Sequence, residues 1–245
     1  MTKKVIIVGA TSGMGKELAI IYLNNGCQVG ITGRRLELLE QIHKKYPSLV
    51  FIESFDVQAD NAAEHLESLI KKIGGMDLLI YSSGYGDVSK ELNWEIEKRT
   101  YETNVKGFVA IVHKAFNYFV AQGHGQIVAL SSIAALRGNS EAPAYSASKA
   151  FMSTYMEGLH MKALRLRTPN GERIPIAVTD IQAGFVATKP AKAGLVFWVA
   201  PVEKAVKQIY RAIEKKKRKV YVTRRWVLIA WMLKLVPFYV FRRII

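Results

Sequence analysis

Short apolar runs that alternate with longer helix-like segments constrain the fold of this chain more than any other feature. Seven runs have the length and composition of strands: 5–8, 28–32, 49–54, 77–81, 125–130, 174–181 and 219–222. The segments between them have helical length and mostly end at Gly or Pro: 14–25, 36–46, 59–73, 91–121, 144–167 and 202–214. Such alternation is typical of βαβ units, so we predict an α/β fold with a parallel sheet.

The composition fits one folded domain with an appended tail. Half of the 245 residues are hydrophobic and 22% are charged, which is typical of a globular protein. No linker or repeat interrupts the pattern, so we predict a single domain over 1–222 and a tail over 223–245. The single cysteine, Cys27, excludes an internal disulfide framework and favours a cytoplasmic location. The five histidines show no ligand spacing, so no metal site is predicted.

The net charge of +15 is concentrated near the C-terminal end. Residues 201–245 contain 13 Lys or Arg and only 2 Glu. Within this part, the apolar run 226–241 is shorter than the ~20 residues that a membrane-spanning helix needs. Its aromatic residues and basic borders predict peripheral contact with an anionic membrane surface, on the cytosolic face. Contact with another subunit is the alternative, and nucleic acid is disfavoured because no nucleic-acid-binding module is recognisable.

A glycine-rich loop lies between the first strand and the first helix. Its sequence is GATSGMG over 9–15, and it permits a tight turn and close backbone approach to a pyrophosphate. The free N–H groups at the start of the following helix also favour a phosphate. The residues predicted to hold the cofactor here are Gly9, Thr11, Ser12, Gly13, Met14 and Gly15.

Two arginines at the end of the second strand indicate which nicotinamide cofactor is bound. A carboxylate at this point usually binds the adenosine ribose, but Arg34 and Arg35 stand here instead. Arginine suits a 2′-phosphate, so NADP(H) is predicted over NAD(H). The alternative is a solvent-facing charge pair at a helix start. After the third strand, Asp56 and Val57 are placed to contact the adenine, although Asp56 serves equally well as a helix cap.

A tyrosine and a lysine four residues apart are the candidate catalytic pair. On a helix, Tyr145 and Lys149 share one face, and a nearby positive charge lowers the pKa of a phenol. Such a phenol can exchange a proton with a substrate oxygen nearer neutral pH. Ser132, thirteen residues before Tyr145, supplies a hydroxyl for the same oxygen.

These motifs occur together in an order that is similar to that of the short-chain dehydrogenase/reductase family. The resemblance is carried by 9–15, the turn at 81–84, and Asn104, Ser132, Tyr145 and Lys149, and it covers 1–222. It implies a doubly wound Rossmann fold, with about seven parallel strands and helices on both faces. It also implies that the protein is an NAD(P)(H)-dependent oxidoreductase and forms a homodimer or homotetramer.

The resemblance also implies a role for each site residue. Tyr145 would be the general acid in reduction and the base in oxidation, and Lys149 would lower its pKa and hold the nicotinamide ribose. Ser132 would orient the substrate carbonyl, and Asn104 would hold a water that relays protons through Lys149. The alternative for Asn104 is a helix-interior residue that bonds to a bent backbone. The remaining cofactor contacts would come from Ser82, Gly84, Val186 and Thr188.

The sequence departs from the family pattern at two turns. The family's Asn-Asn-Ala-Gly is replaced by Tyr-Ser-Ser-Gly at 81–84, so the asparagine bonds that brace the central sheet should be lost or replaced by serine. The family's Pro-Gly is replaced by Ala183-Gly184, which should loosen that turn. Neither departure removes a proton-transfer residue.

The predicted function is the interconversion of a carbonyl and a secondary alcohol with NADP(H). The apolar segment 190–200 follows Thr188, where the family places a substrate lid, and this favours a lipophilic substrate. The alternative for Phe197 and Trp198 is packing on the core. A 3-oxoacyl thioester is the second substrate class, and a non-catalytic NADP(H)-binding sensor or scaffold is the alternative of a different kind.

Overall fold

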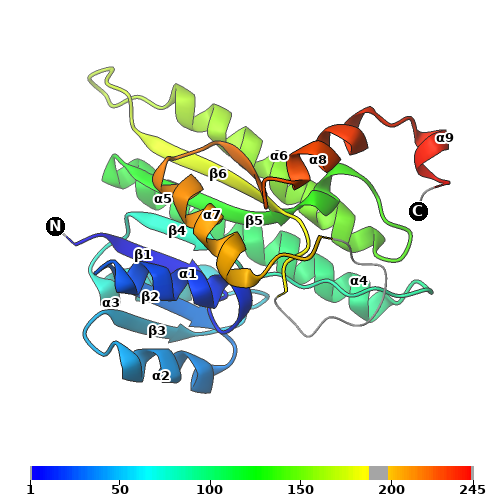
Figure 1. The fold of residues 1–245 in the computed structure, drawn as a ribbon. Coiled ribbons are helices and arrows are strands. Elements are labelled where there is room, and N and C mark those ends of the chain that lie inside the picture. Colours follow the sequence, from blue (N-terminus) through cyan, green and yellow to red (C-terminus); the bar gives the residue numbers. More distant parts are fainter. Residues whose placement is uncertain (1, 188–197, 244–245) are drawn as a thin grey trace.

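Seven parallel strands form one sheet at the centre of the computed structural model, which describes residues 2–187 and 198–243 (Figure 1). The strand order is β3-β2-β1-β4-β5-β6-β7. The strands are β1 (Lys4–Val8), β2 (Gln28–Gly33), β3 (Val50–Ser54), β4 (Leu78–Tyr81), β5 (Gly125–Ser132), β6 (Ile176–Ala183) and β7 (Lys219–Val222). The predicted parallel, doubly wound fold is confirmed.

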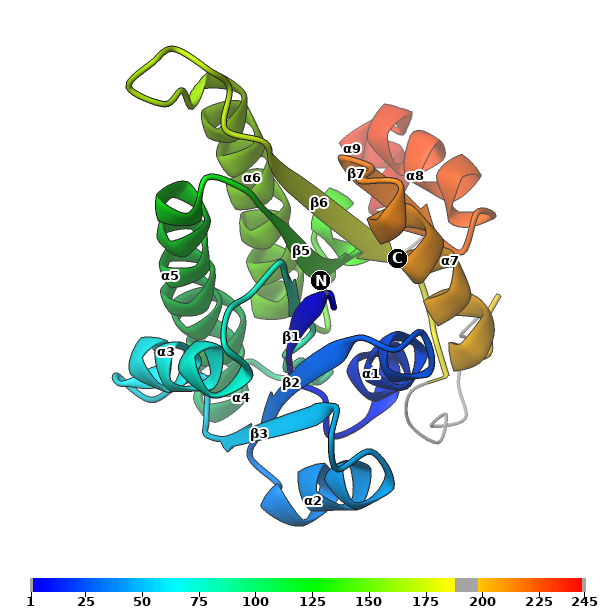
Figure 2. The same cartoon turned by 90° about the vertical axis from the view of Figure 1, so that its left-hand side faces the viewer.

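Helices cover both faces of the sheet (Figure 2). One face is covered by α1 (Gly13–Asn24), α2 (Leu36–Lys45) and α7 (Val202–Glu214). The other is covered by α3 (Ala62–Ile73), α5 (Gly107–Gln122) and α6 (Pro143–Arg165). The described residues also form α4 (Trp94–Tyr101), α8 (Trp226–Leu235) and α9 (Phe238–Phe241).

The central strands are apolar because both of their faces are buried. In β1, Ile6 and Val8 belong to the core beneath α3, α5 and α6, whereas Val5 and Ile7 belong to the core on the other face. All four side chains have no exposed surface. A continuous apolar run is what a strand covered on both faces requires, and this is why the short runs could be recognised as strands.

The direction in which successive strands are added to the sheet reverses between β1 and β4, which are paired neighbours. In such sheets, ligands bind in the crevice outside the carboxyl ends of the strands at this point. Gly9 follows β1 with a φ of +89°, and a Cβ there would lie 2.6 Å from the backbone nitrogen of Ser83, after β4. The two loops therefore approach more closely than any residue with a side chain would allow.

The long helix predicted over 91–121 is divided in two. α4 and α5 are joined by a π-helical turn, Glu102–Lys106, which contains Asn104. A π-helical turn rotates the side chains after it relative to those before it, and such turns are frequent at functional sites. The interruption was not visible in the apolar pattern.

The tail predicted over 223–245 is partly folded onto the domain. On α8, Trp226 and Ala230 are buried and form an apolar cluster with Ile133, which follows β5. Among the described residues, no helix is both long and apolar enough to cross a bilayer.

Candidate active site

The candidate catalytic residues of α6 lie beside the end of β5. Pro143 opens the helix, a position where its missing N–H costs nothing. Lys149 is buried, and its Nζ donates to the carbonyl oxygen of Leu130 at 3.1 Å. The same nitrogen lies 5.7 Å from the ring centroid of Tyr145. The i, i+4 spacing thus brings the phenol and the ammonium together, as expected.

Ser132 is the last residue of β5 and lies beside Tyr145. A hydrogen bond with Ser132 acts to lower the pKa of Tyr145. The Ser132 hydroxyl also accepts from the backbone N–H of Ala134 at 3.1 Å and donates weakly to the carbonyl oxygen of Ala183 at 3.3 Å. These contacts fix the hydroxyl where β5 and β6 end, so Ser132, Tyr145 and Lys149 meet at one point.

The electrostatics of this group differ from the sequence-based expectation. Burial raises the pKa of Tyr145 above its ordinary value, and the Ser132 hydrogen bond offsets only part of that rise. Burial also lowers the pKa of Lys149 to about 8, while the charge of Asp180 acts in the opposite direction. The expected lowering of the tyrosine pKa by Lys149 is therefore not found in the protein alone, because desolvation of the phenol dominates.

Asn104 braces the loop after β4 against α6. Its amide nitrogen donates to the carbonyl oxygen of Tyr85 at 2.7 Å and to the hydroxyl of Ser148 at 2.9 Å. Its amide oxygen accepts from the backbone N–H of Tyr85 at 2.8 Å. Both amide hydrogens are engaged by protein atoms, so the side chain positions this loop, and its bonds to the Tyr85 backbone fit the alternative of a residue that bonds to irregular backbone.

The two departures from the family pattern are each compensated by an aromatic residue. The hydroxyl of Tyr81 donates to the carbonyl oxygen of Thr103 at 2.9 Å, which joins β4 to the π-helical turn. A tyrosine, not the expected serine, supplies this brace. At the second turn, the N–H of Gly184 bonds to the carbonyl oxygen of Val222 at 2.6 Å. A Cβ on Gly184 would lie 2.1 Å from the indole nitrogen of Trp226, so the tail packs directly on this turn.

The glycine-rich loop has a backbone geometry that fits the pyrophosphate of a dinucleotide. Gly13 has a φ of +58° at the start of α1, and a Cβ on Gly15 would lie 2.1 Å from the carbonyl oxygen of Gly9. Ser12 precedes α1 without a side-chain cap, and the first turn of the helix contains no acidic residue. The first N–H groups of α1 are therefore not bonded to a capping side chain, which is the arrangement that binds phosphate at a helix N-terminus.

Of the two arginines, Arg35 is the one that reaches the glycine-rich loop. Its guanidinium donates to the hydroxyls of Thr11 at 2.8 Å and of Ser12 at 3.0 Å. Arg34 instead lies 3.5 Å from a carboxylate oxygen of Asp56. Asp56 also accepts from the backbone N–H of Gln58 at 3.0 Å, so it acts as a local cap in this structure.

The structure describes all but one of the other residues that were predicted to contact the cofactor. Met14 and Val186 are half-buried and pack against the core on the α1 and α7 face. Val57 is buried, and its carbonyl oxygen would lie 2.5 Å from a Cβ on Gly107. A Cβ on Gly84 would lie 3.3 Å from Nζ of Lys149, and Ser82 lies against the glycine-rich loop near Gly15. Thr188 and most of segment 190–200 lie outside the described residues.

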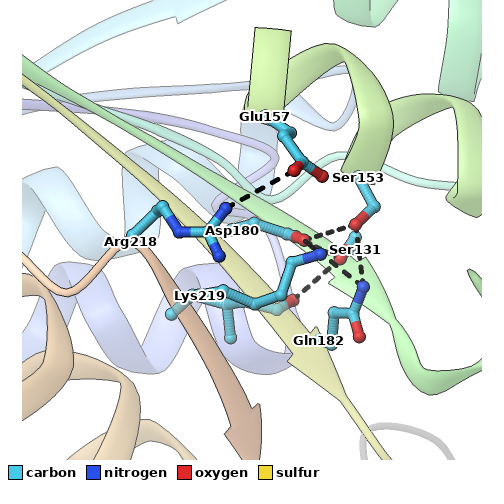
Figure 3. Close-up of polar contacts among 8 residues, drawn as sticks. Ser131, Ser153, Glu157, Asp180, Gln182, Arg218 and Lys219 are labelled. Carbon is cyan, nitrogen blue, oxygen red and sulfur yellow. Dashed lines mark hydrogen bonds and ion pairs between the residues drawn. The ribbon is translucent and has the colours of Figure 1, made fainter. Parts of the chain in front are cut away.

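A buried carboxylate behind the catalytic group was missed in the sequence. Asp180 on β6 accepts hydrogen bonds from Ser131 on β5 and from Ser153 on α6, as Figure 3 shows. Gln182 donates to Ser153 at 2.8 Å, and Nζ of Lys219 on β7 lies 3.7 Å from Asp180. Nothing in the sequence pattern pointed to this cluster, because its members come from four elements that only the sheet order brings together.

Gly86 is a second residue that sequence reasoning missed. A Cβ there would lie 2.2 Å from the ring of Tyr145, which is too close for any side chain. We expect Gly86→Ala to displace the ring and to lower kcat by at least about tenfold, because misplacing a reacting group by 1 Å can cost ~100-fold. The measurement is steady-state turnover beside a fluorescence titration of cofactor binding, which should be unchanged.

The matched control for this change is Gly158→Ala on α6. A Cβ at Gly158 meets nothing within 4 Å, so this variant should keep its activity. Equal activity of the two variants would show that the contact between Gly86 and the Tyr145 ring does not affect turnover.

Comparison with known proteins agrees with the family resemblance and with the fold. The sequence pattern of the short chain dehydrogenase family matches residues 3–194. An uncharacterized oxidoreductase of Myxococcus xanthus is 34% identical over 190 residues, which cover 75% of this chain and 72% of the relative. A short-chain dehydrogenase from Streptomyces avermitilis has a similar fold, with a TM-score of 0.81 and 20% identity, over 95% of this chain and 92% of that one. ElxO, solved with NADP bound, superposes with a TM-score of 0.77 at 19% identity, over 91% and 97% of the two chains.

Proposed function

This chain belongs to the short chain dehydrogenase family, and from that premise we propose that it interconverts a carbonyl and a secondary alcohol with NADP(H). The proposal depends above all on one observation. Ser132, Tyr145 and Lys149 lie together where β5 and β6 end, at the same end of the parallel strands as the glycine-rich loop that follows β1. A binding protein without catalysis has no need for a buried lysine beside a phenol.

In the proposed reaction, each residue has a defined task. When bound, the nicotinamide cofactor would supply or accept the hydride. Tyr145 donates the proton from its hydroxyl to the substrate oxygen in reduction, and the hydroxyl of Ser132 donates to the same oxygen to orient it. Lys149 keeps a positive charge near the phenol when the proton leaves. The hydrogen bond with Ser132 acts to lower the pKa of Tyr145 and so favours release of the proton, against the opposing effect of burial.

The preference for NADP(H) is proposed from Arg35. Its guanidinium lies over the hydroxyls of Thr11 and Ser12 in the glycine-rich loop, and it is exposed to an incoming ligand. A planar guanidinium binds a phosphate through two parallel hydrogen bonds. Arg34 is held toward Asp56 instead, so it is assigned the smaller share of the phosphate contact.

Replacing Arg35 by Ala tests this assignment. We expect the Kd for NADPH to rise by about 10- to 100-fold, because a hydrogen bond to a charged group contributes ~1.5–3 kcal/mol. The Kd for NADH should change little, since it lacks the 2′-phosphate. Both are measured by fluorescence titration. Arg173→Ala, which removes the same charge from an exposed position in the turn before β6, is the control. Equal affinity of the unaltered protein for both cofactors would contradict the proposed preference.

A lipophilic substrate is proposed from the apolar residues that follow β6. Phe185, Trp198 and Val199 are each exposed by about two fifths (44%, 42% and 39%), and the rings of Phe185 and Trp198 both contact Trp226. A screen of NADPH oxidation should therefore begin with lipophilic ketones and aldehydes and include 3-oxoacyl thioesters. Tight binding of NADPH without turnover of any carbonyl or alcohol would favour the non-catalytic alternative.

A further inference from the structure

The outward face of the C-terminal helices is an exposed apolar surface. Eighteen large hydrophobic side chains are exposed among the described residues, and seven of them lie between 227 and 239. We call these seven the tail patch: Val227, Leu228, Trp231, Met232, Leu235, Phe238 and Tyr239. Leu228, Leu235 and Phe238 are each more than 70% exposed. Five of the seven lie at positions 227, 228, 231, 232 and 235 of α8, the spacing of one helix face, and a large exposed apolar surface marks an interaction site.

The tail patch is held in place by the opposite face of α8. Trp226 and Ala230 are buried against the domain, and the side chain of Arg137 donates to the carbonyl oxygens of Leu233 and Val236. The guanidinium of Arg137 also lies 5.5 Å from the ring centroid of Phe241. These contacts fix both helices to the domain, so the apolar side chains point outward and are not free to fold back.

The charges around the tail patch identify its partner. Five exposed cations border or interrupt it: Arg224, Arg225, Lys234, Arg242 and Arg243. No Asp or Glu occurs after Glu214 in the sequence. Over residues 224–243, none of these cations forms an ion pair with a carboxylate. We propose that the tail patch docks on the surface of an anionic lipid bilayer.

The same charges disfavour the other occupants of this face. A second copy of the chain, docked face to face, would bring like charges together around the apolar centre. Nucleic acid would meet the cations but would leave the aromatic and aliphatic side chains without a partner. Lipid provides both anionic headgroups and an apolar interior.

The length of α8 determines how it would lie on the bilayer. A ten-residue helix is about 15 Å long, whereas the hydrocarbon core is about 30 Å thick. The helix would therefore lie along the interface with Leu228, Trp231 and Leu235 in the acyl boundary. This is the arrangement of interfacial amphipathic helices.

This surface adjoins the candidate active site. α8 follows β7 and packs on Ile133, directly after Ser132, and α8 and α9 (red in Figure 1) lie at the end of the sheet where β5 and β6 finish. Trp226 also fills the space over Gly184 and contacts the ring of Phe185. Docking would therefore place the mouth of the site near the lipid, and this last step depends on the proposed function.

Vesicle flotation of the full chain without detergent tests the proposal. The vesicles are phosphatidylcholine alone and phosphatidylcholine mixed with phosphatidylglycerol. The protein should float with the mixed vesicles at low salt, and both high salt and pure phosphatidylcholine should reduce binding. Leu235→Glu should weaken binding at least about tenfold, because a charge must then enter the acyl boundary. Leu164→Glu, on the exposed end of α6, should bind normally.

A charge-matched pair tests the electrostatic part. Arg242→Gln with Arg243→Gln should weaken binding by roughly 25-fold, since each basic residue near an anionic surface contributes about fivefold. Lys44→Gln with Lys45→Gln removes the same charge from the exposed end of α2 and should have little effect.

Two results would overturn the proposal. One is the absence of flotation with either vesicle, and the other is an equal loss for Leu235→Glu and Leu164→Glu. If light scattering shows that Leu235→Glu converts an oligomer into a monomer, and the unaltered chain does not bind vesicles, the tail patch is a contact surface for a second copy of the chain. Tyr145→Phe should float normally, so failure of the catalytic proposal would be seen separately from failure of lipid binding.

Discussion

Tyr145→Phe is expected to lower kcat by roughly 10²- to 10⁴-fold, the contribution typical of a general acid, while NADPH binds with unchanged affinity. The change removes a single oxygen atom. The ring still packs over Gly86, and Lys149 keeps its bond to Leu130, so the site should retain its shape. Steady-state turnover with the best carbonyl from the screen, beside a fluorescence titration with NADPH, separates the two effects.

Tyr155→Phe is the matched control, because it removes a hydroxyl from a half-buried tyrosine on the same helix. The ring of Tyr155 stacks on Phe151 and contacts the edge of Phe108, away from the proposed proton path. Its turnover should match that of the unaltered protein. If Tyr145→Phe keeps a kcat within a few-fold of that protein, another group donates the proton and the assignment of Tyr145 fails.

The sequence was sufficient to predict the fold, and it also predicted that the main candidate site residues lie near one another, because both depend on short-range patterns. Central strands are apolar on both faces, so they could be recognised without any tertiary information. The spacing of Tyr145 and Lys149 specifies a shared helix face, and the loop at 9–15 specifies a helix start after a strand. The structure brings these parts together at the ends of the strands, as expected.

What the sequence did not predict depends on contacts between distant elements. Asp180 meets Ser131 and Ser153 only because β5, β6 and α6 are neighbours in space. The pKa of Tyr145 depends on how deeply the phenol is buried, which spacing alone does not give. The docking of Trp226 on Gly184 likewise joins the tail to a turn about forty residues earlier, a separation beyond local pattern reasoning.

Lys149→Met is expected to have opposite effects on function and stability. Turnover should fall by at least about 10²-fold, because the positive charge beside the phenol is lost. Stability should rise, because the lysine is buried and its charged form is disfavoured there: burial lowers its pKa from 10.5 to about 8. Below pH 8 the folded protein must hold a buried ammonium, at a cost of about 3 kcal/mol. Methionine has a similar shape and no charge.

The size of the gain is limited by what the lysine also provides. Its Nζ donates to the carbonyl oxygen of Leu130, and the variant loses that bond, so we expect a net gain of about 1–3 kcal/mol at pH 7. For a chain of this size, that corresponds to a Tm higher by roughly 2–12 °C. Lys162→Met, at an exposed position on the same helix, should change Tm little.

The pH dependence of this gain identifies its cause. Between about pH 8 and pH 10.5 the unfolded chain binds the lysine proton and the folded protein does not, so the stability of the unaltered protein rises with pH. The Tm difference between Lys149→Met and the unaltered protein should therefore shrink over this range. A variant that is less stable at pH 7 would mean that the bond to Leu130 outweighs the buried charge. In that case Lys149 would stabilise the fold, and the site would not carry the energetic cost expected of a buried catalytic ammonium.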